Sequence, residues 1–166
     1  MILSRDQLIS TLTQAGVMRP TWDVLDGASE TLNAAWVAQS AWSAWVKSLP
    51  AELTTHRDIG GGKTITVPLW VAEVWDCDNH AWSFWEFVMR CQARWAVTQG
   101  KAAAGTAAGT LGYVAEPKAG NVRQGGHDVF WFVDDAGTFR VFEPADGQMV
   151  TLTPTETLSV FTGECR

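Results

Sequence analysis

Residues 125–133 read Gly-Gly-His-Asp-Val-Phe-Trp-Phe-Val, and residues 138–143 read Thr-Phe-Arg-Val-Phe-Glu. Two glycines lead into the first apolar run, which predicts a central strand of a sheet. Between the two runs stand residues 135–137, Asp-Ala-Gly, which suit a three-residue hairpin loop with Gly137 in the left-handed conformation. The stretch therefore predicts an antiparallel hairpin at the centre of the fold.

The register of this hairpin brings two titratable side chains together. A three-residue loop pairs Asp134 with Thr138, and it therefore pairs Val129 with Glu143. His127 lies two residues before Val129, so its side chain points to the same face of the sheet as that of Glu143. Diagonal neighbours on one face are within reach of long side chains. We therefore expect His127 and Glu143 to contact each other.

Helical patterns fill the first half of the chain. Residues 4–7, Ser-Arg-Asp-Gln, have the form of a capping box and open a short helix. An apolar stripe between Ser29 and Pro50 predicts a second helix, and residues 51–66 predict a loop with a short extended piece. Residues 78–97 predict a long helix that is buried on most of its circumference.

Short apolar runs fill the second half. Beside the hairpin they lie at 111–115 and 149–152, separated by Gly, Pro and Asp, which predicts further antiparallel strands. A helical portion over about 1–97 followed by a sheet portion over about 110–160 predicts an α+β fold. The length of 166 residues suits one domain that spans the whole chain.

Two stretches of small residues carry no site of their own. Residues 60–64, Gly-Gly-Gly-Lys-Thr, lack the earlier glycine of a phosphate-binding loop, because Arg57 stands at that position. We expect a flexible turn there. Residues 101–110, rich in Ala and Gly, fit either a loop or a strand that other backbone approaches closely.

The composition excludes several classes of protein. The net charge of −6 and the pI of about 4.9 leave no basic face for nucleic acid. No apolar run approaches the roughly 20 residues of a membrane span, and residues 1–6 lack the features of a signal peptide. Three cysteines, an odd number, indicate a reducing compartment. We therefore expect a cytoplasmic protein, in the host cytoplasm if the source is a phage.

The chain is rich in tryptophan, with ten Trp against one Tyr. An indole combines a large apolar area with one N–H donor. Two interpretations remain open. The tryptophans build a core, or they line a cleft that holds extended ligands.

Cys77 opens the long helix between Asp76 and Asp78. A thiol there meets unsatisfied backbone N–H groups and the positive end of the helix dipole, and both favour the reactive thiolate. The two aspartates act in the opposite direction, because nearby negative charge disfavours a thiolate. Cys77 therefore needs a basic partner, and we choose His127.

These residues predict a site with Cys77 as nucleophile, His127 as proton acceptor and donor, and Glu143 as the group that orients the imidazole. Each residue alone also has a structural interpretation: a buried thiol, a strand histidine and a surface carboxylate. The other cysteines are expected to be unreactive. Cys91 lies on the buried stripe of the long helix, and Cys165 lies next to the C-terminus.

Four short motifs follow one another in the order Trp70, Asp76-Cys77-Asp78, His127 and Glu143-Pro144. Their order resembles the papain-like domain of the mushroom agglutinin family, which also occurs in phage and bacterial proteins, and more loosely bacterial transglutaminase-like cysteine proteinases. The resemblance covers about residues 67–150. It implies a papain-like or transglutaminase-like fold, with a central helix packed on a small antiparallel sheet. It also implies that Trp70 belongs to the site, either as a hydrogen-bond donor to the oxyanion or as a wall of the cleft.

The chain departs from the family pattern at three places. After Cys77-Asp78 the family has an acidic residue, an aromatic residue and Ala, after the histidine a small residue and a later Asn, and after Glu-Pro frequently Gln. Here these places hold Asn79-His80-Ala81, Asp128-Val129-Phe130 and Ala145.

The resemblance implies a cysteine-dependent hydrolase that cleaves peptide or amide bonds through Cys77, His127 and Glu143. Peptidoglycan is the alternative substrate to an ordinary peptide. A function from another class is also open: a non-catalytic phage or bacterial protein that keeps the fold to bind a protein partner or to build a particle. Ala145, in place of the supporting Gln, favours this second interpretation.

Metal ligands are not expected from the spacing of the residues. Cys77 and His80 form half of a zinc pattern, and no second closely spaced pair of Cys or His completes it. No other cofactor is implied. Only the family resemblance implies calcium, for which Asp76, Asp78 and Asp146 offer oxygen ligands.

Overall fold

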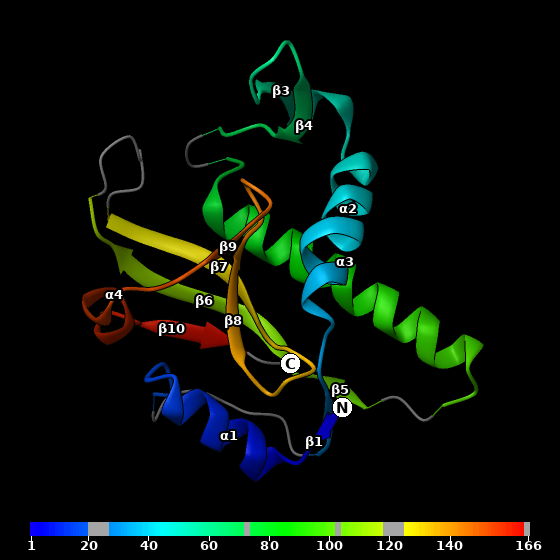
Figure 1. Cartoon of the computed structure of the whole chain (residues 1–166), viewed down its shortest axis with the longest axis vertical. Helices are drawn as coiled ribbons and strands as arrows, with labels where there is room; N and C mark the ends of the chain where they lie inside the picture. The colour runs from blue at the N-terminus through cyan, green and yellow to red at the C-terminus, as the bar shows by residue number, and fades with distance from the viewer. Residues whose placement is uncertain (20–26, 72–73, 102–103, 118–124, 165–166) are drawn as a thin grey trace.

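The computed structural model describes residues 1–19, 27–71, 74–101, 104–117 and 125–164. Its elements confirm the predicted α+β class. A five-stranded antiparallel sheet has the order β10-β6-β7-β8-β9, and the long helix α3 packs against it (Figure 1). Its strands are β6 (Ala108–Ala115), β7 (Gly125–Val133), β8 (Phe139–Glu143), β9 (Gln148–Val150) and β10 (Thr162–Glu164).

Two of the helices begin where their sequence patterns place them. Helix α1 (Arg5–Gln14) starts with a capping box between Ser4 and Gln7, as predicted. Helix α3 (Cys77–Thr98) agrees with the predicted helix to within one residue at either end. Helix α4 (Pro154–Leu158), between β9 and β10, was not predicted, although a capping box also opens it.

The second predicted helix begins later than expected. Ser29–Glu30 form strand β2, which pairs with β1 (Ile2–Leu3) and with β5 (Gly105–Thr106). The helix then consists of a π-helical turn, η1 (Trp36–Ala41), and helix α2 (Trp42–Ser48). The apolar stripe predicted the helix. It carried no sign of the pairing of residues 29–30 with two strands that are distant in the sequence.

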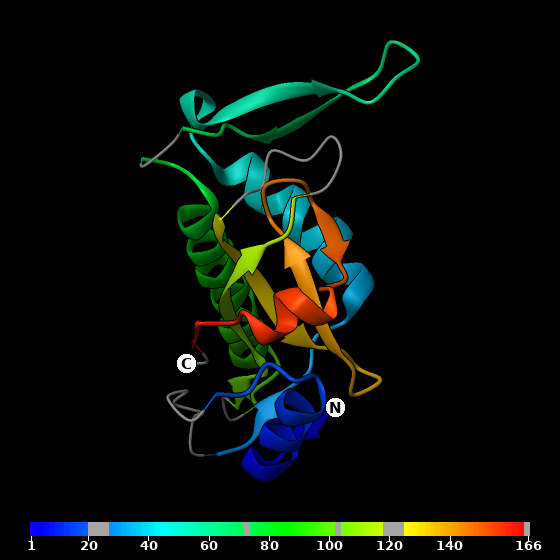
Figure 2. The same ribbon diagram turned by 90° about the vertical axis from the view of Figure 1, so that its left-hand side faces the viewer.

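The region 51–66 was predicted as a loop with a short extended piece, but most of it forms regular structure. It forms a short 3-10 helix, η2 (Ala51–Leu53), and a hairpin of β3 (Thr54–Asp58) and β4 (Thr64–Pro68). Threonine, isoleucine and valine dominate these strands, and β-branched side chains favour the extended backbone. The run Gly60–Gly62 has positive φ at every glycine and closes the hairpin. Figure 2 shows the hairpin projecting from the body of the molecule.

Alternation along β7 divides the core into two layers. Val129, Trp131 and Val133 pack with leucines of α1 on one face of the sheet. Phe130 and Phe132 pack with α2 and α3 on the other face. Both faces of the sheet are covered, which accounts for the nearly continuous apolar run that predicted this strand.

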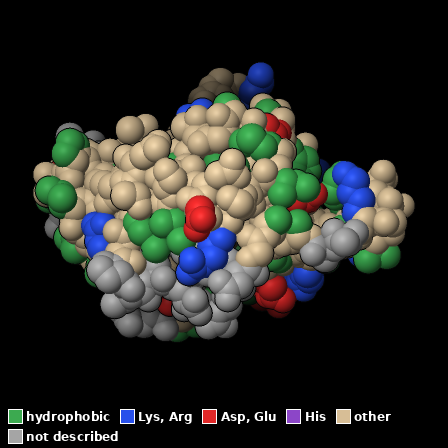
Figure 3. All heavy atoms as spheres, turned by 90° about the horizontal axis from the view of Figure 1, so that it is seen from below, with side chains coloured by type: hydrophobic (Ala, Val, Ile, Leu, Met, Phe, Trp, Pro, Cys, Tyr) green, Lys and Arg blue, Asp and Glu red, His purple; other side chains and the backbone are tan. Residues whose placement is uncertain are grey.

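Positive charge is scattered over the face of the molecule that Figure 3 shows. On the face shown in Figure 3, Lys and Arg side chains stand in separate places rather than in one patch. Among the described residues, no helix is long and apolar enough to cross a bilayer. The cytoplasmic location stays a prediction.

The turn between β8 and β9 is fixed by Trp42 of α2. The indole N–H of Trp42 donates a hydrogen bond to the carbonyl oxygen of Pro144 at 2.7 Å. Gly147, with φ at 71°, lies so close to this indole that a Cβ would come within 2.6 Å of the ring. Both the backbone conformation and the contact with Trp42 therefore require glycine at this position.

We predict that Gly147→Ala destabilises the protein more than Gly61→Ala. Both glycines have left-handed φ, 71° and 62°, so alanine bears the same cost of about 1–2 kcal/mol at either position. Only Gly147 also faces Trp42, and such overpacking adds about 1–3 kcal/mol. Urea unfolding of the two variants measures the difference. Equal losses of stability would show that the turn accommodates the methyl group.

Candidate functional site

The register predicted for the β7–β8 hairpin is confirmed. Val133 pairs with Phe139, and the backbone N–H of Asp134 donates to the carbonyl oxygen of Thr138 at 2.9 Å. Gly137 has φ at 77°, as the three-residue loop requires.

His127 and Glu143 meet inside the protein. His127 Nε2 lies 2.5 Å from Glu143 Oε2, and both side chains are almost completely buried. The other carboxylate oxygen, Oε1, accepts a hydrogen bond from the backbone N–H of Ala145 at 3.1 Å. Ala145, where the resembled family frequently has Gln, therefore supports the carboxylate through its backbone. The edge-on ring of Tyr113, 5.7 Å away between centroids, packs against the imidazole.

Cys77 is the first residue of α3, and its side chain lies close enough to His127 to raise the pKa of the imidazole. Asp76 caps the helix, and its backbone N–H donates to Asn79 Oδ1 at 3.3 Å. The start of α3 lies at the same end of the sheet as the beginning of β7 and the end of β8 (Figures 1 and 2). The structure therefore brings together Cys77, His127 and Glu143, which come from three separate elements.

The contacts of His127 decide its charge. Burial by itself lowers the pKa of the imidazole, but the hydrogen bonds to Cys77 and Glu143 and their charges outweigh burial and raise the pKa to about 9. His127 is therefore an imidazolium at neutral pH. A positive ring beside Cys77 Sγ stabilises negative charge on the sulfur, and the thiolate is the nucleophilic form of cysteine.

The acidic residues around Cys77 divide into two groups. The ligand atoms of Asp76, Cys77 and Asp78 lie within 4.8 Å of one another. Asp146 is instead ion-paired with Arg57, at 2.7 Å between Oδ1 and Nη1. A thiol is a poor partner for calcium, which prefers oxygen ligands, so this group does not match the predicted set of three carboxylates. A calcium requirement stays a prediction that rests on the family resemblance.

Trp70 stands at the rim of the site and not in the core. Its side chain is 52 % exposed, and its ring lies edge-on to His80 at 6.0 Å between centroids. His80 is three residues after Cys77 and so lies on the same face of α3. This position favours a role for Trp70 as a wall of the site.

No role was predicted for His80, although it is fully buried. Its Nε2 lies 3.2 Å from the carbonyl oxygen of Leu69, and the indoles of Trp45, Trp70 and Trp75 surround it edge-on. Burial lowers the pKa of His80, so its imidazole is neutral where that of His127 is charged. A neutral ring with its N–H on Leu69 anchors the segment that carries Trp70 to the start of α3.

One sequence signal could have identified His80, namely its place in Asn79-His80-Ala81, where the chain departs from the family pattern. Asp128 lies at another of these departures, in Asp128-Val129-Phe130. Burial raises the pKa of the Asp128 carboxyl, and the charge of Asp78 raises it further. Asp128 therefore lies near the start of α3.

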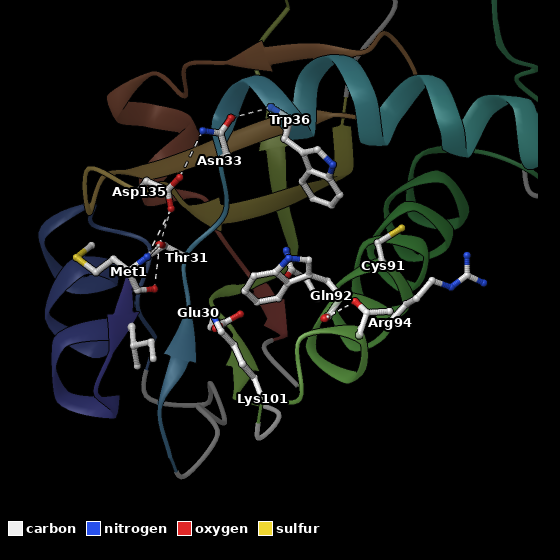
Figure 4. A pocket seen from close by; sticks show the side chains of 13 residues that line it. Met1, Glu30, Thr31, Asn33, Trp36, Cys91, Gln92, Arg94, Lys101 and Asp135 are labelled. Carbon is white, nitrogen blue, oxygen red and sulfur yellow. Dashed lines mark hydrogen bonds and ion pairs between the residues drawn. The ribbon is translucent and has the colours of Figure 1, made fainter.

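Cys91 faces a separate hollow of about 770 Å³ at the other end of α3 (Figure 4). Burial raises the pKa of its thiol, and among the described residues no histidine lines this hollow. In the described part of the chain, Cys91 therefore has no histidine partner in this hollow, and the charges of Arg94 and Arg90 only partly offset the effect of burial. Cys165 lies outside the described residues.

Comparison with known proteins relates the chain to two solved structures. Neither a protein-family model nor a curated protein matches the sequence. One structure is a PSL1a–E64 complex, with a TM-score of 0.63 and 19 % identity. The other is the Polyporus squamosus lectin bound to the human-type influenza-binding epitope Neu5Acα2-6Galβ1-4GlcNAc, with a TM-score of 0.60 and 20 % identity. The matches cover 98 % of this chain and 51 % and 49 % of those chains, so the chain spans about half their length.

These neighbours correct the function predicted from the sequence. They are structures of a mushroom lectin, one of them bound to a glycan epitope, so the predicted cysteine-dependent hydrolysis of peptide or amide bonds is not upheld. The interpretation as a hydrolase and thiol protease is therefore wrong, whereas a peptide or peptidoglycan-like ligand stays a prediction. The likeness fits a relationship to mushroom agglutinins at the level of the fold. A papain-like or transglutaminase-like assignment stays a prediction.

We predict that the melting temperature falls between pH 6.5 and about 9, and that His127→Gln removes most of this dependence. The folded-state pKa of His127, about 9, lies above its ordinary value of 6.5. Stability from its protonated form is therefore fully present below pH 6.5 and is lost as the pH rises through 9. Thermal melts at a series of pH values measure the effect. An unchanged slope in the variant would assign the dependence to another group.

We predict that Trp70→Ala destabilises the protein less than Trp45→Ala. Truncation of a fully buried indole commonly costs about 3–5 kcal/mol. Trp45 is 1 % exposed, whereas about half of the Trp70 side chain already contacts solvent. Urea unfolding of both variants compares the two losses. A loss at Trp70 as large as that at Trp45 would indicate that Trp70 organises the segment around it.

Proposed function

We propose that this chain is a ligand-binding domain whose site is built around the Cys77 thiol. In this proposal residues 1–166 form one domain, the positively charged His127, paired with Glu143, lies beside the sulfur, and Trp70 forms a wall of the site. The proposal covers binding and one covalent step. No bond of the ligand is hydrolysed in it.

The observation that supports the proposal is the run of contacts from Cys77 to His127 to Glu143. The carboxylate is buried, and both its oxygens accept hydrogen bonds, from His127 and from Ala145. Burying charged groups costs free energy unless they are paired. Even a paired set is a costly means of joining two strands if it interacts with no third group. The neighbouring Cys77 thiol is such a third group, because the positively charged imidazolium lies beside it.

The site suits a ligand that carries an electrophilic carbon. E64, the compound in the PSL1a complex, contains an epoxide and is a suitable probe. In the proposed step Cys77 Sγ forms a bond to an epoxide carbon and the carbon–oxygen bond opens. The oxygen then takes the proton of the His127 imidazolium, so charge and atoms balance.

The experiment measures covalent labelling of the intact protein by E64 and by iodoacetamide, with mass spectrometry to locate the label. We expect labelling at Cys77 to be at least about tenfold faster than at Cys91 at pH 7, because burial raises the pKa of Cys91 and no histidine lines its hollow among the described residues. Cys77→Ala should lose the label. His127→Gln and Glu143→Gln should slow it strongly.

Thermal melting provides the control, because each variant must be folded before its labelling rate is compared. Cys91→Ala is the matched variant, since it removes a thiol from the same helix without touching the site. Equal labelling of Cys77 and Cys91 in the folded protein would overturn the proposal, as would a labelling rate that is unchanged in His127→Gln.

A further inference from the structure

A hollow of about 780 Å³ lies on the first half of α3, and the thiol site does not use it. Tryptophans make most of its wall, and polar side chains stand between them. It is lined by Trp75, Asn79, Trp82, Ser83, Trp85, Glu86 and Met89.

Two indoles of this hollow form one surface. The rings of Trp82 and Trp85 lie 5.1 Å apart between centroids at an interplanar angle of 57°. Trp82 is 42 % exposed, which is costly for so large an apolar side chain in water. Trp85 is only 5 % exposed. The pair offers a broad apolar face with one ring reaching into solvent.

Two donors at the hollow lack acceptors. Among the described residues, no group accepts a hydrogen bond from the indole N–H of Trp75 or from that of Trp85. Buried indole N–H groups usually find a partner, because leaving them unpaired costs free energy. Both N–H groups are closed to solvent in this structure, so a ligand oxygen would pair with them only after a shift of the side chains that cover them.

The polar residues add one further donor and one acceptor. Ser83 Oγ already accepts from the indole of Trp45 at 3.1 Å, so its hydroxyl hydrogen is left to donate. Glu86 offers an exposed carboxylate that is only loosely paired with Arg90, at 3.5 Å. The hollow therefore combines an apolar face, N–H donors and an acidic acceptor.

We propose that this hollow is a carbohydrate-binding subsite for neutral oligosaccharides. A pyranose ring has an apolar C–H face that can stack on an indole, and its hydroxyls both accept and donate hydrogen bonds. An anionic ligand would be repelled by Glu86, and a purely apolar ligand would leave the N–H groups of Trp75 and Trp85 unpaired. The proposal does not depend on the reactivity of Cys77.

Helix α3 also provides a matched control. Trp95, near its other end, is 42 % exposed as well, but Lys101 Nζ already lies over its ring, 4.3 Å from the centroid. Trp95 therefore has the same exposure as Trp82 on the same helix, with its face occupied by a side chain of the protein.

The experiment titrates the full chain with N-acetyllactosamine, chitotriose and cellotriose, up to about 10 mM, by calorimetry and tryptophan fluorescence. We expect at least one of the three to bind and to shift the emission. Trp82→Ala should weaken that binding about tenfold or more, Trp82→Phe less, and Trp95→Ala should leave it unchanged. Trp85→Phe, which keeps an aromatic ring and removes the N–H, should also weaken it.

Binding should persist in Cys77→Ala, which separates this proposal from the one on the thiol. The carbohydrate proposal is overturned if none of the three sugars binds the folded protein. It is also overturned if Trp82→Ala and Trp95→Ala weaken binding equally, or if binding is lost only in Cys77→Ala.

Discussion

The buried pair of His127 and Glu143 is the interaction on which the candidate site depends. Two titratable groups without access to water need each other, and neither can be removed without leaving an uncompensated partner. The surrounding elements are arranged to keep the pair intact. Gly137 sets the register of its two strands, the N–H of Ala145 satisfies the second oxygen, and Trp42 fixes the turn that follows Glu143.

What could be predicted from the sequence was decided by short-range patterns. Gly137 and the length of its loop fixed the strand register, and with it the contact between His127 and Glu143. Periodicity located α3, so that Cys77 was correctly placed at its start. The pairing of residues 29–30 with strands distant in the sequence had no local signal, and it displaced the beginning of the second helix.

The remaining parts of the site depend on tertiary packing. The approach of Cys77 to His127 requires the long helix to dock on the sheet, which no spacing in the sequence specifies. The same holds for His80, whose surroundings are assembled from α2, α3 and the segment before α3. The sequence left open whether the tryptophans build the core or line a cleft, and the structure contains both buried and exposed tryptophans. Trp45 and Trp131 are core residues, whereas Trp70 and Trp82 are exposed around the first half of α3.

The strength of the ion pair between Arg57 and Asp146, a residue close to Glu143 in the chain, depends on ionic strength. It joins the projecting β3–β4 hairpin to the turn that follows β8, and its two side chains are 37 % and 38 % exposed. Salt at about 0.15 M screens such charges over roughly 8 Å, whereas the buried pair of His127 and Glu143 is shielded from mobile ions. Added salt therefore weakens the Arg57–Asp146 ion pair more than it weakens the buried pair. The exposed pair of Arg57 and Asp146 thus responds to the salt concentration, whereas the buried pair of His127 and Glu143 responds less.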